Sequence, residues 1–586
     1  MRTAAAHFDD IPGDLPTGTV PEDVDLDSLA HWVLVQVNSP YSNVLTDGVV
    51  WRDLFAFTDT YRTIVGKHEV LSTFPARRKE TQCGVFERTK TAPRRVSVGQ
   101  QSSWVDVDAS FEFLKDGLPA RGRATLSVTR NAGDELCVWL MRTWLHHFED
   151  YGSPEIPRSG EQTCDAVPKA DMYDVLIVGG GQAGLSVAGR LQALGIRYVL
   201  LEKHKTLGDV WRTRYASLKW HTPKEYGNLP FGRMFADDIP ELVPAKAIGN
   251  AHEAWAKKYR INSLTDCTVE QARYNGDRWQ VRTRYVGMQR TFEATNLVIA
   301  IGPGSTHPHR PGWATIEAVS ASGFRGKVVH AKEYDSCQEW LGKDARGACV
   351  GTANTGHDIV EDMVNAGMQT TMLQRGSTFV LPGEWLLAAE GAHYNARTSN
   401  DIADQEQFTM PYKLVREILN TNIHAGIRAN PDRFNRLERA GFKLDRFGDL
   451  YTNIFTRFGG HYIDTGTSAR IANRDIRMET TPARRLVADG IELEDDRVLP
   501  CDLVVLATGY DHDFRKDAES ILGPEIADRM DDYHGMDPEG EIRGCAKFAG
   551  VPHLWYHGGD VRSSRFMSRF LALQIQSQLL QAKLSD

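Results

Sequence analysis

The pattern of hydrophobic and polar positions changes along the chain, and the changes mark domain boundaries. Residues 29–153 are rich in aromatics, and residues 101–107, 123–129 and 136–145 have strand-like sequences. A helical pattern precedes these strands, most clearly in residues 50–63. Helices followed by antiparallel strands predict a small α+β domain over residues 29–153. An acidic, proline-punctuated arm, residues 1–28, precedes it.

The remainder of the chain has a different character. Residues 154–170 contain three prolines and no periodicity, which predicts a linker. After this linker, strand-turn-helix units continue nearly to the end of the chain. Residues 397–446 interrupt them as a long polar segment with a helical pattern. The sequence therefore predicts an α/β region after the first domain, with a helical insertion.

Composition and charge limit the classes of function. With 586 residues, 41% hydrophobic and 25% charged, the chain is an ordinary globular sequence of roughly two to four domains. A net charge of −9 argues against binding nucleic acid or an anionic membrane. No apolar run approaches the ~18 residues of a membrane span, and the first residues lack the apolar stretch of a signal peptide. We therefore expect a cytoplasmic protein.

The cysteines argue against two kinds of site. All eight are scattered, and no two are closer than 12 positions. A zinc site or a redox dithiol needs close spacing such as CxxC. We therefore expect no metal site and reduced, packed thiols.

A glycine-rich turn in residues 173–184 (YDVLIVGGGQAG) predicts a dinucleotide site. Gly179 permits the tight turn, Gly181 lets a pyrophosphate approach the backbone, and Gly184 lets a helix starting near Leu185 pack against the strand. The helix N-terminus, with Gln182, attracts the phosphates. The next strand ends at Glu202, whose carboxylate can accept hydrogen bonds from a ribose. This unit is predicted to bind FAD.

A second turn, residues 351–356 (GTANTG), follows a short apolar strand and leads into a helical pattern. It provides Gly351, Asn354 and Gly356, but Ala353 replaces the middle glycine. The following strand ends in Gln374 and Arg375, not in an acid. A cation at the ribose end suits a 2′-phosphate, so NADP is favoured over NAD. The alternative is that Arg375 is an ordinary surface arginine.

Two more strands end in glycine turns, at residues 296–304 and 502–510, the latter containing Gly509. The predicted fold class is therefore α/β, with one Rossmann-like dinucleotide domain interrupted by another and preceded by the small α+β domain. The predicted boundaries are 171–325 for the first part of the FAD domain, 326–494 for the NAD(P)H domain with its insertion, and 495–586 for the second part of the FAD domain.

Residues 324–334 (FRGKVVHAKEY) make the interpretation more specific. Their pattern comprises Phe324, Gly326, His330 and Tyr334, and it resembles the signature of the class B flavin monooxygenases. Members devoted to Baeyer–Villiger chemistry usually carry tryptophan at the last position. Tyr334 is similar to what flavin-containing and N-hydroxylating monooxygenases have there.

Residues 208–231 extend this resemblance. Trp211 matches a tryptophan that contacts the flavin, and Lys224 matches a lysine of the family. His221 stands where most flavin-containing monooxygenases have asparagine, and in this respect the chain resembles the type II group and the plant YUCCA enzymes. The N-terminal extension matches the type II group, and residues 29–153 resemble the nuclear-transport-factor-2-like (SnoaL-like) domain in pattern.

The resemblance implies a mechanism and its cofactors. NADPH, or NADH, would reduce FAD, and molecular oxygen would then give a C4a-peroxyflavin that transfers one oxygen atom to a small organic substrate. It implies Baeyer–Villiger oxidation of ketones to esters or lactones, with His221 facing the flavin as the catalytic residue. The alternatives are N- or S-oxygenation of soft nucleophiles and a YUCCA-like oxidative decarboxylation.

The sequence leaves several roles open. His330 is expected to couple domain motion, and His461 and Tyr462 are weaker candidates for the substrate side. A disulfide reductase is disfavoured because it needs a close cysteine pair, whereas an NADPH-dependent electron-transfer reductase or oxidase is a more distant alternative. The N-terminal domain is expected to form a homodimer, the other readings being a binding module or a second active site.

Overall fold

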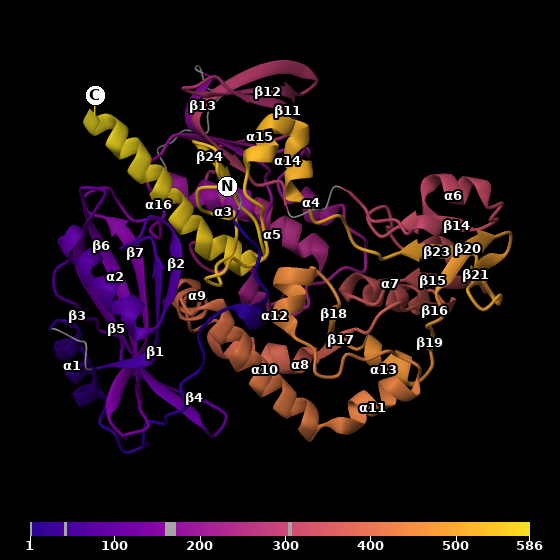
Figure 1. Ribbon diagram of the computed structural model, residues 1–586. Coiled ribbons are helices and arrows are strands. Elements are labelled where there is room, and N and C mark those ends of the chain that lie inside the picture. Colours follow the sequence, from indigo (N-terminus) through magenta and orange to yellow (C-terminus); the bar gives the residue numbers. More distant parts are fainter. Residues whose placement is uncertain (1–2, 40–43, 159–170, 303–306, 586) are drawn as a thin grey trace.

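A computed structural model describes residues 3–39, 44–158, 171–302 and 307–585 of the chain. The described residues form an N-terminal domain, two units built on mainly parallel sheets, and a helical insertion (Figure 1). The N-terminal domain lies on the left in Figure 1, the first unit at the upper centre and the second on the right. Most of the predicted linker, residues 159–170, lies outside the described residues, as do Cys164 and the end of the glycine turn at residues 303–306.

The N-terminal domain is a seven-stranded sheet with two helices. The sheet order is β2-β1-β7-β6-β5-β3, with β4 paired to β5, and β1 runs parallel to β7. Its elements are α1 (Leu26–Val37), β1 (Leu45–Leu54), β2 (Tyr61–Val65), α2 (Lys67–Glu80), β3 (Glu87–Arg88), β4 (Arg94–Val98), β5 (Ser102–Lys115), β6 (Leu118–Arg130) and β7 (Leu136–Phe148). The three predicted strands lie within β5, β6 and β7. Likeness of this domain to the nuclear-transport-factor-2-like fold stays a prediction.

The helix predicted in residues 50–63 is wrong, because this segment contains the end of β1, a turn and the start of β2. Six consecutive residues of β1, Val49 to Leu54, are buried. A strand covered on both faces loses the alternation by which a strand is recognised. One face of the sheet packs on its own helices, and the other is covered by distant parts of the chain.

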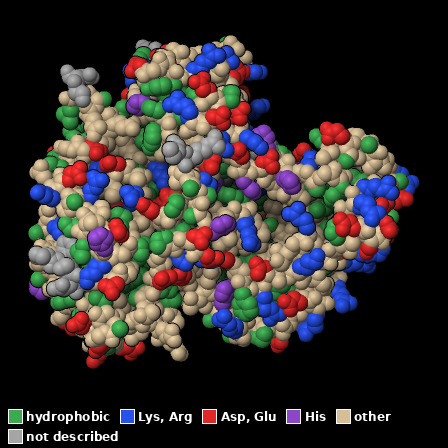
Figure 2. Space-filling model, in the orientation of Figure 1, with side chains coloured by type: hydrophobic (Ala, Val, Ile, Leu, Met, Phe, Trp, Pro, Cys, Tyr) green, Lys and Arg blue, Asp and Glu red, His purple; other side chains and the backbone are tan. Residues whose placement is uncertain are grey.

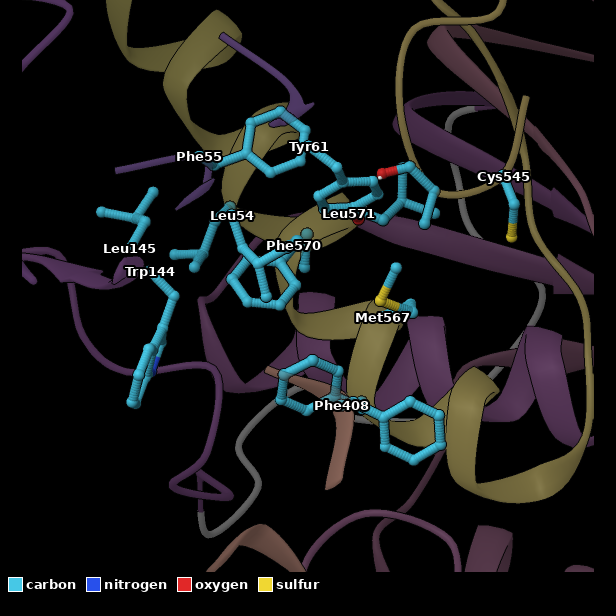
Figure 3. Packing of buried hydrophobic residues seen from close by; sticks show 14 of the residues in the cluster. Leu54, Phe55, Tyr61, Trp144, Leu145, Phe408, Cys545, Met567, Phe570 and Leu571 are labelled. Atoms are coloured by element: carbon cyan, nitrogen blue, oxygen red, sulfur yellow. Dashed lines mark hydrogen bonds between the residues drawn. The ribbon is translucent and has the colours of Figure 1, made fainter. Parts of the chain in front are cut away.

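The C-terminal helix α16 (Val561–Ser585) is one such cover. Figure 3 shows Phe570 of this helix lying against Phe55 and Tyr61 of the N-terminal domain. The ring centroids of Phe570 are 6.2 Å and 5.9 Å from those of Phe55 and Tyr61. The two ends of the chain therefore share one hydrophobic core.

The first parallel unit has the strand order β10-β9-β8-β13-β12-β11, with β24 added beside β13. Strands β11, β12 and β13 form an antiparallel meander, and the other neighbours are parallel. The elements are β8 (Met172–Val178), α3 (Gln182–Ala193), β9 (Tyr198–Leu201), α4 (Asp209–Arg212), α5 (Ala245–Lys258), β10 (Ser263–Leu264), β11 (Cys267–Tyr274), β12 (Trp279–Tyr285), β13 (Met288–Ile299) and β24 (Leu554–Tyr556).

The second parallel unit has the order β14-β23-β15-β16-β19. Strand β23 pairs with β14 and β15, so the chain returns to the first unit later than the predicted boundary at residue 495. A buried apolar strand does not show from its sequence which of two similar sheets it will join. The elements are α6 (Ile316–Ala321), β14 (Lys327–His330), β15 (Arg346–Val350), α7 (Asn354–Asn365), β16 (Gln369–Leu373), β19 (Ile476–Glu479), β20 (Ala483–Val487), β21 (Gly490–Leu493), β22 (Val498–Pro500) and β23 (Leu503–Leu506).

The helical insertion predicted for residues 397–446 is part of a longer segment between β16 and β19, at the bottom of Figure 1. It comprises β17 (Phe379–Pro382), α8 (Gly383–His393), α9 (Asn400–Phe408), α10 (Tyr412–Ala429), α11 (Pro431–Arg439), α12 (Leu450–Thr452), a π-helical turn η5 (Asn453–Arg457), β18 (His461–Asp464) and α13 (Thr467–Ala472). Helices α14 (Phe514–Leu522) and α15 (Pro524–Arg529) follow β23. The short 3₁₀ turns are η1 (Phe8–Asp10), η2 (Lys224–Gly227), η3 (Gly312–Ala314) and η4 (Gln338–Trp340).

Two absences hold for the described part of the chain. No helix in it has the length and apolar character needed to cross a bilayer. It also contains no group of three or more His, Cys, Asp or Glu side chains arranged to hold a metal ion. The seven described cysteines are free thiols.

A buried ion pair joins the N-terminal domain to a distant segment. Arg52 donates to both carboxylate oxygens of Glu541, at 2.7 Å and 2.6 Å, and to the carbonyls of Phe408 and Met410. Both charged side chains are 0% exposed. Nearby, Arg62 and Glu539 form a similar pair whose side chains are 42% and 34% exposed.

We predict that Arg52→Ala lowers the free energy of unfolding by about 3–5 kcal/mol, because it leaves the Glu541 carboxylate buried without its partner. Thermal and urea unfolding measure the effect. Arg62→Ala is the matched control, and its cost should stay below about 1 kcal/mol because solvent screens that pair. Equal losses in the two variants would contradict the assignment of Arg52–Glu541 as the stronger link.

Candidate functional site

The first glycine turn brings strand β8 directly against the start of helix α3. A Cβ atom on Gly179 would lie 2.4 Å from the Ala300 carbonyl oxygen, and one on Gly184 would lie 1.9 Å from that of Gly179. Gly179 also has a left-handed φ of 108°. A Cβ on Gly181 would meet nothing within 4 Å, so the backbone there faces open space. The turn has the room that a pyrophosphate needs beside the N-terminus of α3, and its residues fit FAD.

Helix α3 begins at Gln182, three residues earlier than predicted. Its N-cap Gly181 has no side chain to accept hydrogen bonds from the first turn, which leaves those N–H groups for a ligand. Gln182 itself donates from Nε2 to the Gly559 carbonyl at 2.8 Å. Gln182 therefore ties the first turn to the segment before α16.

Glu202 is held inside the same turn. Its carboxylate accepts hydrogen bonds from the Gly180 N–H at 2.6 Å and from the backbone N–H of His204 at 2.7 Å, and the His204 ring lies 2.6 Å away. Burial opposes ionisation, but these hydrogen bonds outweigh it and lower the pKa of Glu202. Glu202 is thus an ionised acceptor at the end of β9, where a ribose is expected.

The second turn repeats this geometry in the second unit. A Cβ on Gly351 would lie 2.3 Å from the Ala507 carbonyl oxygen, and one on Gly356 would lie 2.2 Å from that of Gly351. Ala353, at the middle position, has φ −87° and ψ −175°, close to the −77° and −173° of Gly181. Any residue adopts this conformation, so alanine causes no backbone strain there. Its methyl group only narrows the space in front of α7, and the turn still fits a dinucleotide.

Asn354 and Gly509 have structural contacts. The Asn354 side-chain oxygen accepts a hydrogen bond from the Ile463 N–H at 2.9 Å, which joins α7 to β18. The Gly509 carbonyl accepts from His330 Nε2 at 3.1 Å, and Gly509 has a left-handed φ of 78°. Both residues therefore shape the second unit around its turn.

Arg375 is exposed on the loop after β16, and the structure adds a second cation beside it. Gln374 makes two hydrogen bonds with the backbone of Lys443, at 2.7 Å and 2.8 Å. The Lys443 ammonium group donates to the Thr480 carbonyl at 3.0 Å and lies 3.5 Å from the Arg375 carbonyl. Lys443 belongs to the insertion and was not predicted, because its position depends on contacts that are distant in sequence.

The signature residues lie at the junction of β14 with its neighbours. A Cβ on Gly326 would lie 2.4 Å from the Asp502 carbonyl oxygen and 2.5 Å from the Phe324 ring, so glycine is required by packing. His330 Nδ1 accepts from the Lys332 N–H at 3.1 Å, which leaves the proton on Nε2 for Gly509. The Tyr334 hydroxyl donates to Asp362 on α7. These contacts serve structure within the second unit.

A cavity of about 320 Å³ lies between the two glycine turns. It is lined by residues of both units, among them Gln182, Trp211, His221, Asn354, Asp358 and Asp560. Trp211 and His221 come from the segment after β9, whereas Asn354 and Asp358 come from α7. The structure therefore brings together predicted residues of the flavin side and of the nicotinamide side.

His221 is buried in this cavity wall and paired with a carboxylate. Its Nε2 is 2.9 Å from Asp358 Oδ1, and the Tyr215 hydroxyl donates to Asp358 Oδ2 at 2.9 Å. A carboxylate accepts, so Nε2 carries a proton and Nδ1 is left as an acceptor in the neutral ring. His221 Nδ1 is shielded from solvent and has no partner. Only the doubly protonated ring offers a donor at Nδ1.

Asp358 was not predicted, although the sequence carried a signal for it. It follows Asn354 by four residues on the predicted helix, so both lie on the same face of α7. The phenol of Tyr215 is kept neutral, because burial and the neighbouring Asp358 both raise the pKa of Tyr215.

His461 and Tyr462 are placed behind the cavity. The Tyr462 ring stacks on that of His357, with centroids 3.5 Å apart, and its hydroxyl accepts from the Thr465 N–H. Burial and the neighbouring His221 lower the pKa of His461 to about 4. From their strand β18 it is Ile463 that lines the cavity.

Known proteins were compared with this chain. The family described as pyridine nucleotide-disulphide oxidoreductase matches residues 176–384. The probable indole-3-pyruvate monooxygenase YUCCA9 of Arabidopsis thaliana is 29% identical over 341 residues, which are 57% of this chain and 74% of that protein. The indole-3-pyruvate monooxygenase YUCCA4 of Oryza sativa subsp. japonica is 27% identical over 60% of this chain and 78% of its own length. A flavin-containing monooxygenase from Stenotrophomonas maltophilia matches 70% of this chain and 99% of its own at 18% identity, with a TM-score of 0.47.

The two glycine turns and these sequence relatives define the class of protein. The chain is an enzyme, an FAD-dependent monooxygenase. It uses FAD and NADPH, with molecular oxygen as co-substrate.

We predict that Gly181→Leu abolishes flavin binding while the protein still folds. The φ and ψ of Gly181 suit leucine, but its side chain would occupy the open space that the pyrophosphate needs. Flavin absorbance per chain measures the loss, and circular dichroism checks the fold. Gly181→Ala, which copies Ala353, should have an intermediate effect. Gly391→Leu, at another open glycine, should keep full flavin content, and a yellow Gly181→Leu protein would show that the site is misplaced.

Proposed function

We propose that this enzyme inserts one oxygen atom next to the carbonyl group of a small organic ketone, giving an ester or lactone by Baeyer–Villiger oxidation. When bound, FAD supplies the electron transfer and the activation of oxygen. The protein residues orient the reactants, exclude water and place charges. The observation that carries the proposal is His221 in the cavity between the two turns, with its Nε2 fixed by Asp358.

His221 can act in two ways at this place. Neutral, its Nδ1 can accept a hydrogen bond from the amide of the nicotinamide. Doubly protonated, it donates from Nδ1 and can stabilise negative charge on the reacting oxygen, which attack on a carbonyl carbon requires. Oxygenation of soft sulfur or nitrogen needs an electrophilic oxygen instead, so a donor that stabilises the anion favours the carbonyl substrate.

A second candidate is oxidative decarboxylation of a 2-oxo acid. The curated relatives are described as indole-3-pyruvate monooxygenases, and indole-3-pyruvate is a 2-oxo acid. Both candidates share attack on a carbonyl carbon. Product analysis with a cyclic ketone, a thioether and an aromatic 2-oxo acid, side by side, decides among them. Lactone supports the proposal, whereas release of CO₂ or formation of sulfoxide supports an alternative, and peroxide alone would indicate a simple oxidase.

We further propose that the N-terminal domain is nuclear-transport-factor-2-like and serves in assembly as a homodimer. The support for the likeness in fold is its sheet, one face of which carries helices α1 and α2. Because α16 and other distant parts of the same chain cover the other face, the dimer would form through another surface of this domain. Its interior is filled with aromatic side chains such as Trp51, Phe57, Phe74 and Phe111, which argues against a second active site.

We predict that Arg375→Ala raises KM for NADPH about fivefold and leaves the use of NADH nearly unchanged. Arg375 is exposed, so its contact with a 2′-phosphate is worth about 1 kcal/mol. Steady-state kinetics with both coenzymes measure the effect. Lys443→Ala should act in the same direction, because its ammonium group lies beside the Arg375 backbone. Equal losses with NADPH and NADH would contradict the assignment.

We predict that His221→Ala lowers the oxygenated product formed per NADPH roughly tenfold or more, the effect of losing a hydrogen bond to a charged group. Hydrogen peroxide should appear in its place, while flavin content and flavin reduction stay close to those of the parent enzyme. Product and peroxide yields with a cyclic ketone measure the change. His461→Ala, at a half-buried histidine of β18 that does not line the cavity, is the control and should form as much product per NADPH as the parent enzyme. If His221→Ala forms as much oxygenated product per NADPH as the parent enzyme, then His221 has only a packing role.

A further inference from the structure

A second cavity, of about 330 Å³, has lining residues that differ from those of the cleft between the glycine turns. We call it the His534 pocket and define it by six lining residues: Phe458, His512, Phe514, Arg515, Tyr533 and His534. Its wall also includes residues 5–7 of the N-terminal arm, and Ala6 pairs with Met536 there. Figure 2 shows several histidine side chains around the hollow where the right-hand lobe meets the rest of the molecule.

The backbone of this pocket is strained at two non-glycine residues. Phe458 has φ 52° and ψ 32°, and His534 has φ 71°. Their rings pack edge to face, with centroids 4.6 Å apart. Phe458 directly follows the π-helical turn η5. Left-handed bulky residues and π-helical turns both cost stability and concentrate at functional sites.

His534 has a neutral ring with both nitrogens unpaired. Its residue as a whole is half-buried, but both ring nitrogens are shielded from solvent and have no hydrogen-bond partner. Tyr533 and Phe514 pack against the ring at centroid distances of 3.9 Å and 5.2 Å. Burial, with His512 and Arg543 adding to it, lowers the pKa of His534 well below its usual range. The ring therefore offers one donor and one acceptor to a group that completes the site.

The charges at the rim of the pocket compensate one another. Arg515 Nε is 3.0 Å from Asp532 and 3.3 Å from Asp513, and Arg543 Nη1 is 3.0 Å from Asp532. Two arginines thus face two aspartates, and little net charge remains for an anionic ligand. Aromatic walls with a neutral hydrogen-bonding group suit an uncharged ligand.

The pocket adjoins the predicted flavin site through one side chain. A Cβ on Gly558 would lie 2.8 Å from the Tyr533 hydroxyl, so Tyr533 stands directly against this glycine. The next residue, Gly559, accepts the hydrogen bond from Gln182 of the first turn. Tyr533 therefore packs against the segment that is hydrogen-bonded to the first dinucleotide turn, so the His534 pocket and this turn are neighbours.

We propose that the His534 pocket receives the organic substrate, and that this substrate is an uncharged aromatic or alicyclic ketone whose carbonyl oxygen accepts a hydrogen bond from the His534 ring. The rings of Phe458, Phe514 and Tyr533 hold its apolar body. The assignment as the substrate site rests on the proposed function, whereas binding of the ketone does not.

Calorimetric titration of the oxidised holoenzyme tests binding, with acetophenone as the uncharged probe and benzoate as its anionic counterpart. We expect acetophenone to bind and benzoate to bind more weakly. His534→Asn should weaken acetophenone binding about fivefold to tenfold, the loss of one neutral hydrogen bond. Asparagine tolerates the left-handed backbone, so the fold should persist. Phe458→Gly, which relieves strain while removing an aromatic wall, should also weaken binding and should not lower the melting temperature.

His553→Asn is the matched control, because His553 is another half-buried histidine with a left-handed φ, 58°, and an unpaired Nδ1 outside the pocket. Equal acetophenone affinity in His534→Asn and His553→Asn would overturn the proposal, and so would tighter binding of benzoate. If the ketone is oxidised and its KM is unchanged in His534→Asn, the inference fails while the proposed function stands. If acetophenone binding depends on His534 but no oxygenated product forms with any ketone, the proposed function fails and the pocket stands as a ligand site.

Discussion

The close contact of backbone with backbone at the two glycine turns is the constraint on which the rest of the structure depends. At Gly184 and Gly356 a Cβ would lie about 2 Å from a carbonyl oxygen of the same turn. Only glycine lets helices α3 and α7 begin so close to the strands before them, and this closeness points both helix N-termini toward the cleft between the units. His221, Asp358 and Gln182 obtain their positions from these two helices and the segments packed against them.

The parallel units could be predicted from the sequence because their signals are local. A buried strand, a glycine turn and a helix follow one another within about 30 residues, and the position of each element limits where the next one can begin. The membership of β23 could not be predicted, since its short apolar sequence suits either sheet. The N-terminal strand β1 was missed for a related reason. One of its faces is buried by the domain's own helices, and the other by α16 and Glu541, several hundred residues later, which no local pattern indicates.

The candidate site divides in the same way. The tight turns at Gly179 and Gly351 could be predicted from the spacing of the glycines. The residues that the predicted side chains contact could not be predicted. Asp358 pairs with His221 across 137 positions, and Gln374 fixes Lys443 across 69. Contacts of this kind depend on the tertiary fold. The sequence alone predicts the helix face or the loop on which a residue lies, but it does not predict the distant residue that it contacts.

The Arg52–Glu541 pair has a consequence for how the chain is made. The two residues are 489 positions apart, and at roughly 5–20 residues per second the ribosome needs on the order of 25–100 s to synthesise the stretch between them. During this time Arg52, Phe55 and Tyr61 are without the carboxylate and the helix α16 that cover them in the finished molecule. The nascent N-terminal sheet therefore has an apolar, positively charged face exposed to solvent over this period, and the stability that this face gives the domain is gained only when residues 541–585 have been made.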